Sequence, residues 1–194
     1  IMGVKAEKVT RKVAIVRCSG YRRTDEKGKE TGLKLKGEYE GIHDCVAATK
    51  VAGRGPTICK FACLGFGNCV KACKYDAIHI VDGIARVDFD KCVGCMSCAA
   101  ACPRNLIVPV EDGHDVVVIC SSHAKGAVTV RGCTIGCVGC GVCIKICPQG
   151  AITMDRNLAK IDYDKCNGCG LCANACPKHM ILDAKLQIRH KEEV

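Results

Sequence analysis

The fold of this chain is decided by two stretches that share one spacing, Cys137-Val-Gly-Cys140-Gly-Val-Cys143-Ile-Lys-Ile-Cys147-Pro148 and Cys166-Asn-Gly-Cys169-Gly-Leu-Cys172-Ala-Asn-Ala-Cys176-Pro177. In each stretch two residues separate three cysteines, a fourth cysteine follows after three more residues, and a proline comes directly after it. A third run, from Cys92 to Pro103, has the same spacing. Because this spacing occurs three times in 194 residues, we expect these cysteines to act together as ligands.

This spacing is the one at which cysteine thiolates hold [4Fe–4S] clusters in bacterial ferredoxins. A four-iron cube presents its irons on a small rounded surface. Three thiolates from one tight loop can therefore reach three irons, while the fourth thiolate comes from elsewhere in the chain. In ferredoxins with two clusters, the fourth cysteine of each run binds the neighbouring cluster.

An internal repeat relates the two halves of the cysteine-rich region. Cys133 lies 74 residues after Cys59 (133 − 59), and the same offset maps later cysteines onto earlier ones: Cys137 onto Cys63, Cys143 onto Cys69, Cys147 onto Cys73, Cys166 onto Cys92 and Cys176 onto Cys102. One position breaks the match, because Cys140 falls on Phe66. The predicted fold is α+β, with two tandem bacterial ferredoxin-like modules that each hold two [4Fe–4S] clusters.

Four ligand sets follow from the repeat and from the exchange of the fourth cysteine. The sets of the second module are Cys147, Cys166, Cys169 and Cys172, and Cys137, Cys140, Cys143 and Cys176. Those of the first module are Cys73, Cys92, Cys95 and Cys98, and Cys59, Cys63, Cys69 and Cys102. In the last set, Cys59 is expected to replace the ligand that is missing at Phe66.

Four of the 20 cysteines remain outside these sets: Cys18, Cys45, Cys120 and Cys133. One interpretation is that they are buried free thiols. The other is a fifth cluster, because four cysteines suffice for one, and Cys18 and Cys120 each end a similar apolar strand. We therefore expect four clusters, or five if these cysteines bind another, with iron of the clusters as the only metal and no catalytic side chain.

Disulfide bonds and zinc are two other uses of so many cysteines. A disulfide scaffold requires a secretory route, and the first ten residues do not read as a signal peptide. Zinc ribbons use two Cys-x2-Cys pairs separated by a spacer, rather than three cysteines in seven residues followed by Cys-Pro. The chain has three Phe, four Tyr and no Trp, so we expect cluster ligation to substitute for an aromatic core.

The rest of the chain is expected to divide as follows: 1–55, an irregular N-terminal segment with a strand and a basic loop region; 56–112, the first module; 113–132, a bridging hairpin; 133–194, the second module and a tail. Apolar alternation around a turn, as in 77–88, predicts a short hairpin within each module. Segments 114–120 and 127–130 are predicted to pair as the bridging hairpin. The polar run 19–41 is predicted to be a solvated loop.

The formal net charge of +9 would by itself favour nucleic acid or an anionic membrane surface as partner. Each [4Fe–4S] cluster with its four thiolates carries about −2, so four clusters lower the total to roughly +1. We therefore expect no nucleic acid partner.

Three further motifs precede the regular cysteine runs: Val13-Ala-Ile-Val-Arg-Cys18, Gly41-Ile-His-Asp-Cys45 and Cys63-Leu-Gly-Phe-Gly-Asn-Cys69-Val-Lys-Ala-Cys73. In this order, the chain resembles over nearly its whole length the B subunit of the Rnf complex, the ion-translocating ferredoxin:NAD oxidoreductase of bacterial membranes. The form with two ferredoxin pairs looks like the clostridial type, and the match is to its C-terminal polyferredoxin part. Lys74 stands where the pattern has proline after a cysteine, a departure that leaves ligation intact.

This resemblance implies that the chain takes electrons from soluble reduced ferredoxin and passes them to membrane-bound subunits. It would thus be an electron-transfer subunit of an oxidoreductase and translocase, without a site that makes or breaks bonds. The alternative is a polyferredoxin subunit of a soluble hydrogenase or related reductase. Family members begin with a membrane helix and another cluster domain, so we expect a segment before Ile1. That segment or partner subunits would hold the chain at the cytoplasmic face of the bacterial membrane.

An acidic ferredoxin is expected to dock on basic side chains of the N-terminal region, where cluster charge cancels them least. These side chains are Arg11, Lys12, Arg17, Arg22, Arg23, Lys27, Lys29, Lys34 and Lys36. The other interpretation is a solvated charged loop without a partner, because the same region contains the acidic residues Asp25, Glu26, Glu30, Glu38 and Glu40.

Overall fold

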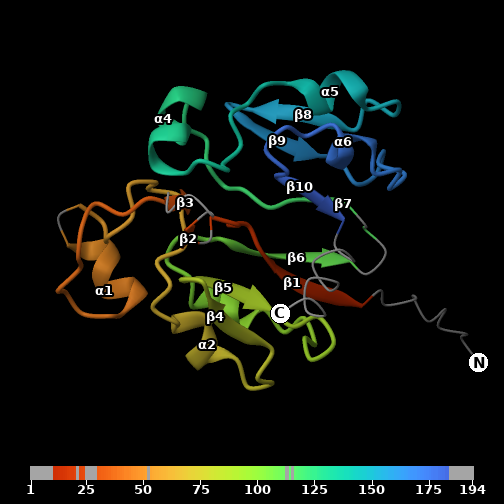
Figure 1. Cartoon of the computed structure of the whole chain (residues 1–194). Helices are drawn as coiled ribbons and strands as arrows, with labels where there is room; N and C mark the ends of the chain where they lie inside the picture. Colours follow the sequence, from red (N-terminus) through yellow and green to blue (C-terminus); the bar gives the residue numbers. More distant parts are fainter. Residues whose placement is uncertain are drawn as a thin grey trace, which may run out of the picture.

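The computed structural model describes residues 11–20, 22–24, 30–51, 53–111, 114 and 116–183. Two modules of the same design lie on either side of a central strand, β1 (Lys12–Val16) (Figure 1). Each module contains a short hairpin between two short helices, and mixed helix and strand content agrees with the predicted α+β class. Among the described residues, no helix is both long and apolar enough to cross a membrane.

The hairpin of each module forms where apolar alternation predicts it. In the first module, β4 (Ile78–Val81) pairs antiparallel with β5 (Ile84–Val87), flanked by helices α2 (Asn68–Ala72) and α3 (Ser97–Ala100). In the second, β8 (Ile152–Asp155) pairs with β9 (Leu158–Ile161), between α5 (Val142–Ile146) and α6 (Leu171–Asn174). The tight turn of the first hairpin uses positive φ at Asp82 and Gly83, as its Asp-Gly sequence predicts.

Each module is completed by a strand from outside it. β1 (Lys12–Val16) pairs antiparallel with β6 (Ile107–Glu111), and β7 (Val116–Val118) pairs antiparallel with β10 (Ile181–Asp183). β10 begins 74 residues after β6 (181 − 107), so the closing strands obey the same repeat as the cysteines. Val16 and Val118 occupy corresponding places, since they pair with Ile107 and Ile181.

The predicted bridging hairpin is wrong. The strand expected in 114–120 exists as β7, but it pairs with β10, while the proposed partner lies in a helix, α4 (Gly126–Gly132). The alternation in 127–130 is misleading because Val128 and Val130 are exposed on this helix, whereas Thr129 is buried. All three valines of β7 are buried, and the second module offers the apolar surface that covers them.

The N-terminal segment is more ordered than a solvated loop. It contains a short hairpin, β2 (Arg22–Thr24) with β3 (Glu30–Gly32), and a helix, α1 (Cys45–Lys50). Leu33 is buried, and the backbone of Lys34 donates to the carbonyl of Gly132 and accepts from the amide of Ile58, both at 3.0 Å. The loop prediction for 19–41 is therefore wrong around residues 30–35, where Leu33 and Leu35 alternate with polar residues over too short a stretch to stand out in a polar run.

Two hydrophobic cores share the central strand. Ala14 and Val16 of β1 belong to the core of the first module, while Ile15 between them belongs to the core of the second. The largest fully buried side chains are aliphatic or threonine, and both cores include buried cysteines, such as Cys63 in the first and Cys143 in the second. Cysteine sulfur thus fills volume that aromatic rings occupy in other small domains.

We predict that removing iron unfolds the chain, because the cores lose the bonds that hold their cysteines together. Chelation under anaerobic conditions should abolish native far-UV circular dichroism in step with iron release. Native circular dichroism after complete iron removal would contradict this prediction.

Candidate iron–sulfur cluster sites

Three of the four expected ligand sets each surround one pocket. Site 2 is lined by Cys73, Cys92, Cys95 and Cys98; site 3 by Cys137, Cys140, Cys143 and Cys176; site 4 by Cys147, Cys166, Cys169 and Cys172. In each site three cysteines come from one loop and the first turn of the helix after it. The fourth comes from the other end of the module, as the exchange of the last cysteine predicts.

Residues with a left-handed backbone make these loops tight. Gly94 and Met96 in the loop of site 2 both have positive φ, and Met96 directly precedes helix α3. A side chain at Gly94 would collide with the carbonyl oxygen of Lys12, so this loop lies directly against β1. The glycines between the cysteines therefore serve both the curvature of the loop and its contact with the central strand.

Backbone amides point at several of the sulfurs. The amide of Ala14 donates to Cys92 Sγ at 3.4 Å, that of Ala77 to Cys73 Sγ at 3.4 Å, and that of Met180 to Cys176 Sγ at 3.3 Å. Such bonds favour the thiolate form and influence the reduction potential of a bound cluster.

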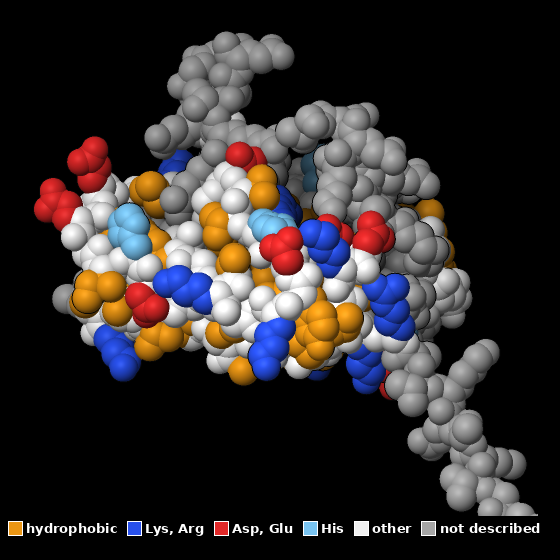
Figure 2. Space-filling model, turned by 90° about the horizontal axis from the view of Figure 1, so that it is seen from below, with side chains coloured by type: hydrophobic (Ala, Val, Ile, Leu, Met, Phe, Trp, Pro, Cys, Tyr) orange, Lys and Arg blue, Asp and Glu red, His pale blue; other side chains and the backbone are white. Residues whose placement is uncertain are grey.

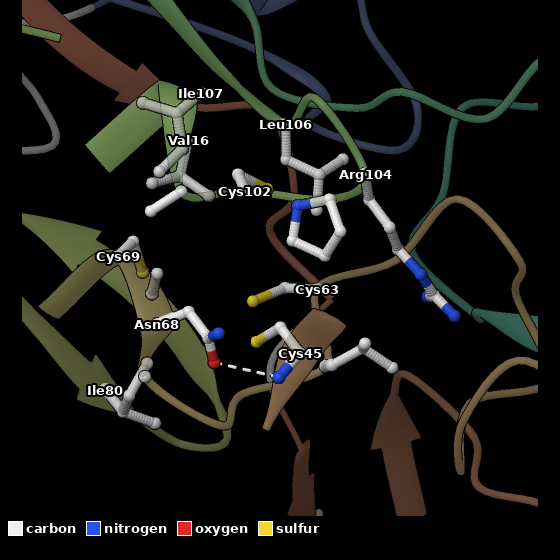
Figure 3. A pocket seen from close by; sticks show the side chains of 15 residues that line it. Val16, Cys45, Cys63, Asn68, Cys69, Ile80, Cys102, Arg104, Leu106 and Ile107 are labelled. Carbon is white, nitrogen blue, oxygen red and sulfur yellow. Dashed lines mark hydrogen bonds between the residues drawn. The ribbon is translucent and has the colours of Figure 1, made fainter. Parts of the chain in front are cut away.

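The remaining set of the first module differs from the expected one in a single member. Site 1 is lined by Cys45, Cys63, Cys69 and Cys102, so Cys45 occupies the place expected for Cys59 (Figure 3). All of these except Cys102 are buried.

Asp44 and Asn68 position Cys45 at the start of helix α1. Asp44 caps the helix by accepting from the amide of Ala47 at 2.8 Å, and its second carboxylate oxygen accepts from Asn68 Nδ2 at 2.7 Å. Asn68 Oδ1 in turn accepts from the amide of Cys45 at 2.8 Å (Figure 3). These hydrogen bonds hold the pKa of Asp44 below its usual value. Because Asn68 precedes Cys69, the network connects two cysteines of the site.

Phe66, the residue that replaces a ligand, packs in an aromatic stack. Its ring lies 5.2 Å from that of Tyr39 and 5.0 Å from that of His43, measured between ring centres. The stack fastens the segment before α1 to the loop of site 1. At position 66, where the repeat would place a cysteine, Phe66 thus takes part in the packing that brings Cys45 to the site. The sequence signal for this was the helix-capping Asp44 directly before a cysteine.

The four other cysteines, Cys18, Cys59, Cys120 and Cys133, share one neighbourhood, which we call site 5. Cys133 interacts electrostatically with Cys120 and Cys59, and Cys18 with Cys120. The bridging backbone of Lys34 holds the segments of Cys59 and Cys133 side by side. The set expected from the sequence had Cys45 in place of Cys59, whereas Cys45 lines the pocket of site 1 and Cys59 lies near Cys133 and Cys120.

Burial makes an uncompensated thiolate costly at these sites. It raises the pKa of Cys18 and Cys69 to about 12 and that of Cys133 and Cys143 to about 11. Iron supplies the positive charge that such thiolates need, and its binding releases their protons. Four cysteines line each of the pockets of sites 1 to 4, and a four-iron cube takes four thiolates spread around its surface. These donor sets therefore fit [4Fe–4S] clusters.

The five sites differ in whether they contain a solvent-exposed cysteine. Sites 2, 3 and 4 each contain one exposed cysteine, namely Cys95, Cys140 and Cys169. No cysteine of site 1 or site 5 is exposed. The outer three sites are therefore closer to solvent, and the inner two lie within the protein.

Most described members of the predicted basic docking region have partners inside the chain. Arg11 donates to the carbonyl of Phe89 at 2.7 Å, Lys12 forms an ion pair with Glu111 at 3.2 Å, and Arg17 donates to the carbonyl of Cys120 at 3.3 Å.

The side chains of Arg22, Arg23, Lys27 and Lys29 lie outside the described residues. On the face in Figure 2, Lys and Arg side chains stand apart, with hydrophobic and acidic ones between them. Docking on the N-terminal region thus stays a prediction.

Comparison with protein families identifies the cluster-binding regions. A 4Fe-4S dicluster domain model matches residues 136–180, and a 4Fe-4S binding domain model matches residues 85–108. The chain therefore contains 4Fe–4S ferredoxin-type domains in both modules. The match in the first module begins after Phe66 and Cys69, that is, after the part in which the regular spacing is lost.

Relatives with assigned functions match most of the chain. It is 40% identical over 167 residues to the B subunit of the Na(+)-translocating ferredoxin:NAD(+) oxidoreductase complex of Acetobacterium woodii, and 39% identical over 167 residues to the proton-translocating counterpart of Clostridium ljungdahlii. Both matches cover 86% of this chain. The resemblance to the family of Rnf B subunits is confirmed.

A third relative, the B subunit of the ion-translocating oxidoreductase complex of Methanosarcina acetivorans, is 35% identical over the same share of the chain. The matches cover 47, 56 and 60% of these relatives, so the chain spans about half of their length. All three relatives are subunits of complexes that are named for moving ions.

Paired substitutions should separate the two assignments of Cys45 and Cys59. If Cys45 and Cys69 serve the same cluster, the double variant Cys45→Ala, Cys69→Ala should lose about four irons, as each single variant does. If Cys59 binds a separate cluster at site 5, the matched double variant Cys59→Ala, Cys69→Ala should lose about eight, because it then removes a ligand from two clusters. Iron analysis and cluster counting by electron paramagnetic resonance measure both, and the reverse pattern would restore Cys59 to site 1.

Proposed function

We propose that this chain is an electron relay with five [4Fe–4S] clusters, in a membrane-bound ion-translocating ferredoxin:NAD oxidoreductase. When bound, each cluster accepts and releases one electron. Four clusters would occupy sites 1 to 4, with Cys45 as a ligand of site 1, and the fifth would occupy site 5. The role of the protein is to set the spacing, burial and hydrogen bonding of these sites, and no side chain is assigned a bond-making step.

The position of site 5 is the observation that supports a relay through the whole chain. Cys18 Sγ accepts a hydrogen bond at 3.3 Å from the amide of Cys63, a cysteine of site 1. Cys120 has the backbone of Cys137, a cysteine of site 3, as a hydrogen-bond partner. Site 5 therefore adjoins one site of each module, and without it the two cluster pairs would be separated by the junction between modules.

The repeat also supports site 5 as a built site. Cys59 and Cys133 are related by the 74-residue offset (133 − 59), and Cys18 and Cys120 each lie two residues after the corresponding ends of β1 and β7. Each half of the molecule thus contributes one loop cysteine and one strand-end cysteine. Free thiols would not need to meet at the junction in this matched way.

The proposal takes reduced ferredoxin as the electron donor, because the names of the relatives include ferredoxin. It further takes partner subunits in the membrane as the electron acceptor. It also includes a location at the cytoplasmic face of the membrane. Exposed cysteines at sites 2, 3 and 4 support electron exchange with partners there, because an external donor must come close to a cluster. Matches to Rnf B subunits over 86% of the chain favour this function over a polyferredoxin of a soluble hydrogenase or reductase.

We predict about 20 irons per chain, with a matching amount of acid-labile sulfide, in protein isolated without oxygen. About 16 irons would show that site 5 is not a cluster site. Fewer than roughly 12 irons, with zinc in their place, would contradict the proposed function itself.

Loss of the fifth cluster should interrupt the relay between modules. The Cys133→Ala variant should lose about four irons and keep the clusters of sites 1 to 4. In stopped-flow reduction by ferredoxin, the clusters of one module should still be reduced rapidly, while those of the other are reduced in a slower phase. Wild-type reduction kinetics in a variant that has lost these irons would show that electrons do not pass through site 5.

A further inference from the structure

Arg104 is a partly buried cation between site 1 and site 5. It follows the site 1 ligand Cys102 by two residues, and its side chain borders the pocket of site 1 (Figure 3). Its guanidinium donates to the carbonyls of Ala62 and Cys59. These carbonyls lie at the two ends of the segment that runs from site 5 to Cys63 of site 1. The guanidinium is thus hydrogen-bonded to backbone that adjoins both sites.

Hydrogen bonds hold the guanidinium in one orientation. Besides the two carbonyls, it donates to the carbonyl of Arg54 and, at 3.0 Å, to the buried hydroxyl of Thr57. Within the described part of the chain, these partners are all neutral oxygens, and no carboxylate forms an ion pair with the guanidinium. Its charge is therefore not neutralised by an acidic side chain there.

The positive charge of Arg104 acts on cysteines of the two inner sites. Arg104 interacts electrostatically with Cys59 and Cys18 of site 5 and with Cys63 and Cys45 of site 1. Reduction adds one negative charge to a cluster, and a fixed cation nearby stabilises that charge more strongly in a partly buried setting than in water. The rigid fork of an arginine keeps the cation in place better than a flexible lysine does.

The second module contains a natural comparison. Lys178 occupies the position 74 residues after Arg104 (178 − 104) and borders site 3. It donates one hydrogen bond, at 2.9 Å to the carbonyl of Thr134. The duplicated modules thus differ in the cation beside the cysteine exchanged between their clusters.

We propose that Arg104 raises the reduction potentials of the clusters at site 1 and site 5, and so favours residence of the electron at the junction between the modules. This rests on the proposed function, because it requires clusters at both sites. Arg104 acts through its charge on neighbouring ligands, and is a positioning residue rather than a catalytic one.

The test is a potentiometric titration of the full cluster-loaded chain, followed by electron paramagnetic resonance. Arg104→Gln and Arg104→Met remove the charge, Arg104→Lys keeps it, and Lys178→Gln is the matched control. In the two neutral variants, the ratio of reduced to oxidised cluster at a fixed potential should fall for two components by up to tenfold, about 59 mV for one electron. Arg104→Lys should recover most of this shift, and Lys178→Gln should leave the two components unchanged.

Iron content separates the possible failures. Wild-type protein without clusters at sites 1 and 5 would overturn the proposed function, whatever the variants do. With wild-type iron intact, unchanged potentials in both neutral variants would overturn the inference about Arg104. Loss of clusters from both neutral variants would make Arg104 a structural residue and would also overturn it, as would equal shifts in Arg104→Lys and Arg104→Gln.

Discussion

The bond between iron and buried cysteine sulfur is the interaction on which the rest of this structure depends. The chain has few aromatic side chains, and its two larger cores are built from aliphatic residues and cysteines. Burial alone raises the pKa of these thiols and disfavours thiolates, so the ionised form needs a cation. Metal binding therefore contributes to folding directly, and the short helices and two-residue turns are stable as parts of the ligand loops rather than by themselves.

Duplication explains more than the two modules. β6 and β10 are related by the repeat, and each pairs with a strand from outside its own module, β1 or β7. These added strands end close to Cys18 and Cys120, so the same pairing that closes each module also delivers a cysteine to the junction. Cysteines therefore gather at the junction between the two ferredoxin-like modules, at site 5, without any regular cysteine run.

The two modules have diverged where they meet the N-terminal segment. In the second module a regular run supplies Cys140, whereas in the first an aromatic stack around Phe66 fastens the segment that carries Cys45. Exchange of a local ligand for one from a distant helix makes site 1 depend on the order of the N-terminal segment. The same segment bridges Ile58 and Gly132 through the backbone of Lys34, so it joins the modules as well as completing a site.

Local patterns in the sequence were sufficient for features that depend on neighbouring residues. The regular spacing predicted which cysteines line the pockets of sites 2, 3 and 4, because three cysteines of each site lie within one loop and the fourth obeys the repeat. The hairpin of each module and the turn at Asp82 and Gly83 were also predicted, because they too depend on neighbouring residues. By contrast, the partner of β7 and the place of Cys45 beside the pocket of site 1 were decided by tertiary structure. They depend on contacts between residues far apart in the chain, such as Asn68 with Cys45 and Lys34 with Gly132. Spacing along the sequence does not reveal which of several equivalent thiols these contacts bring together.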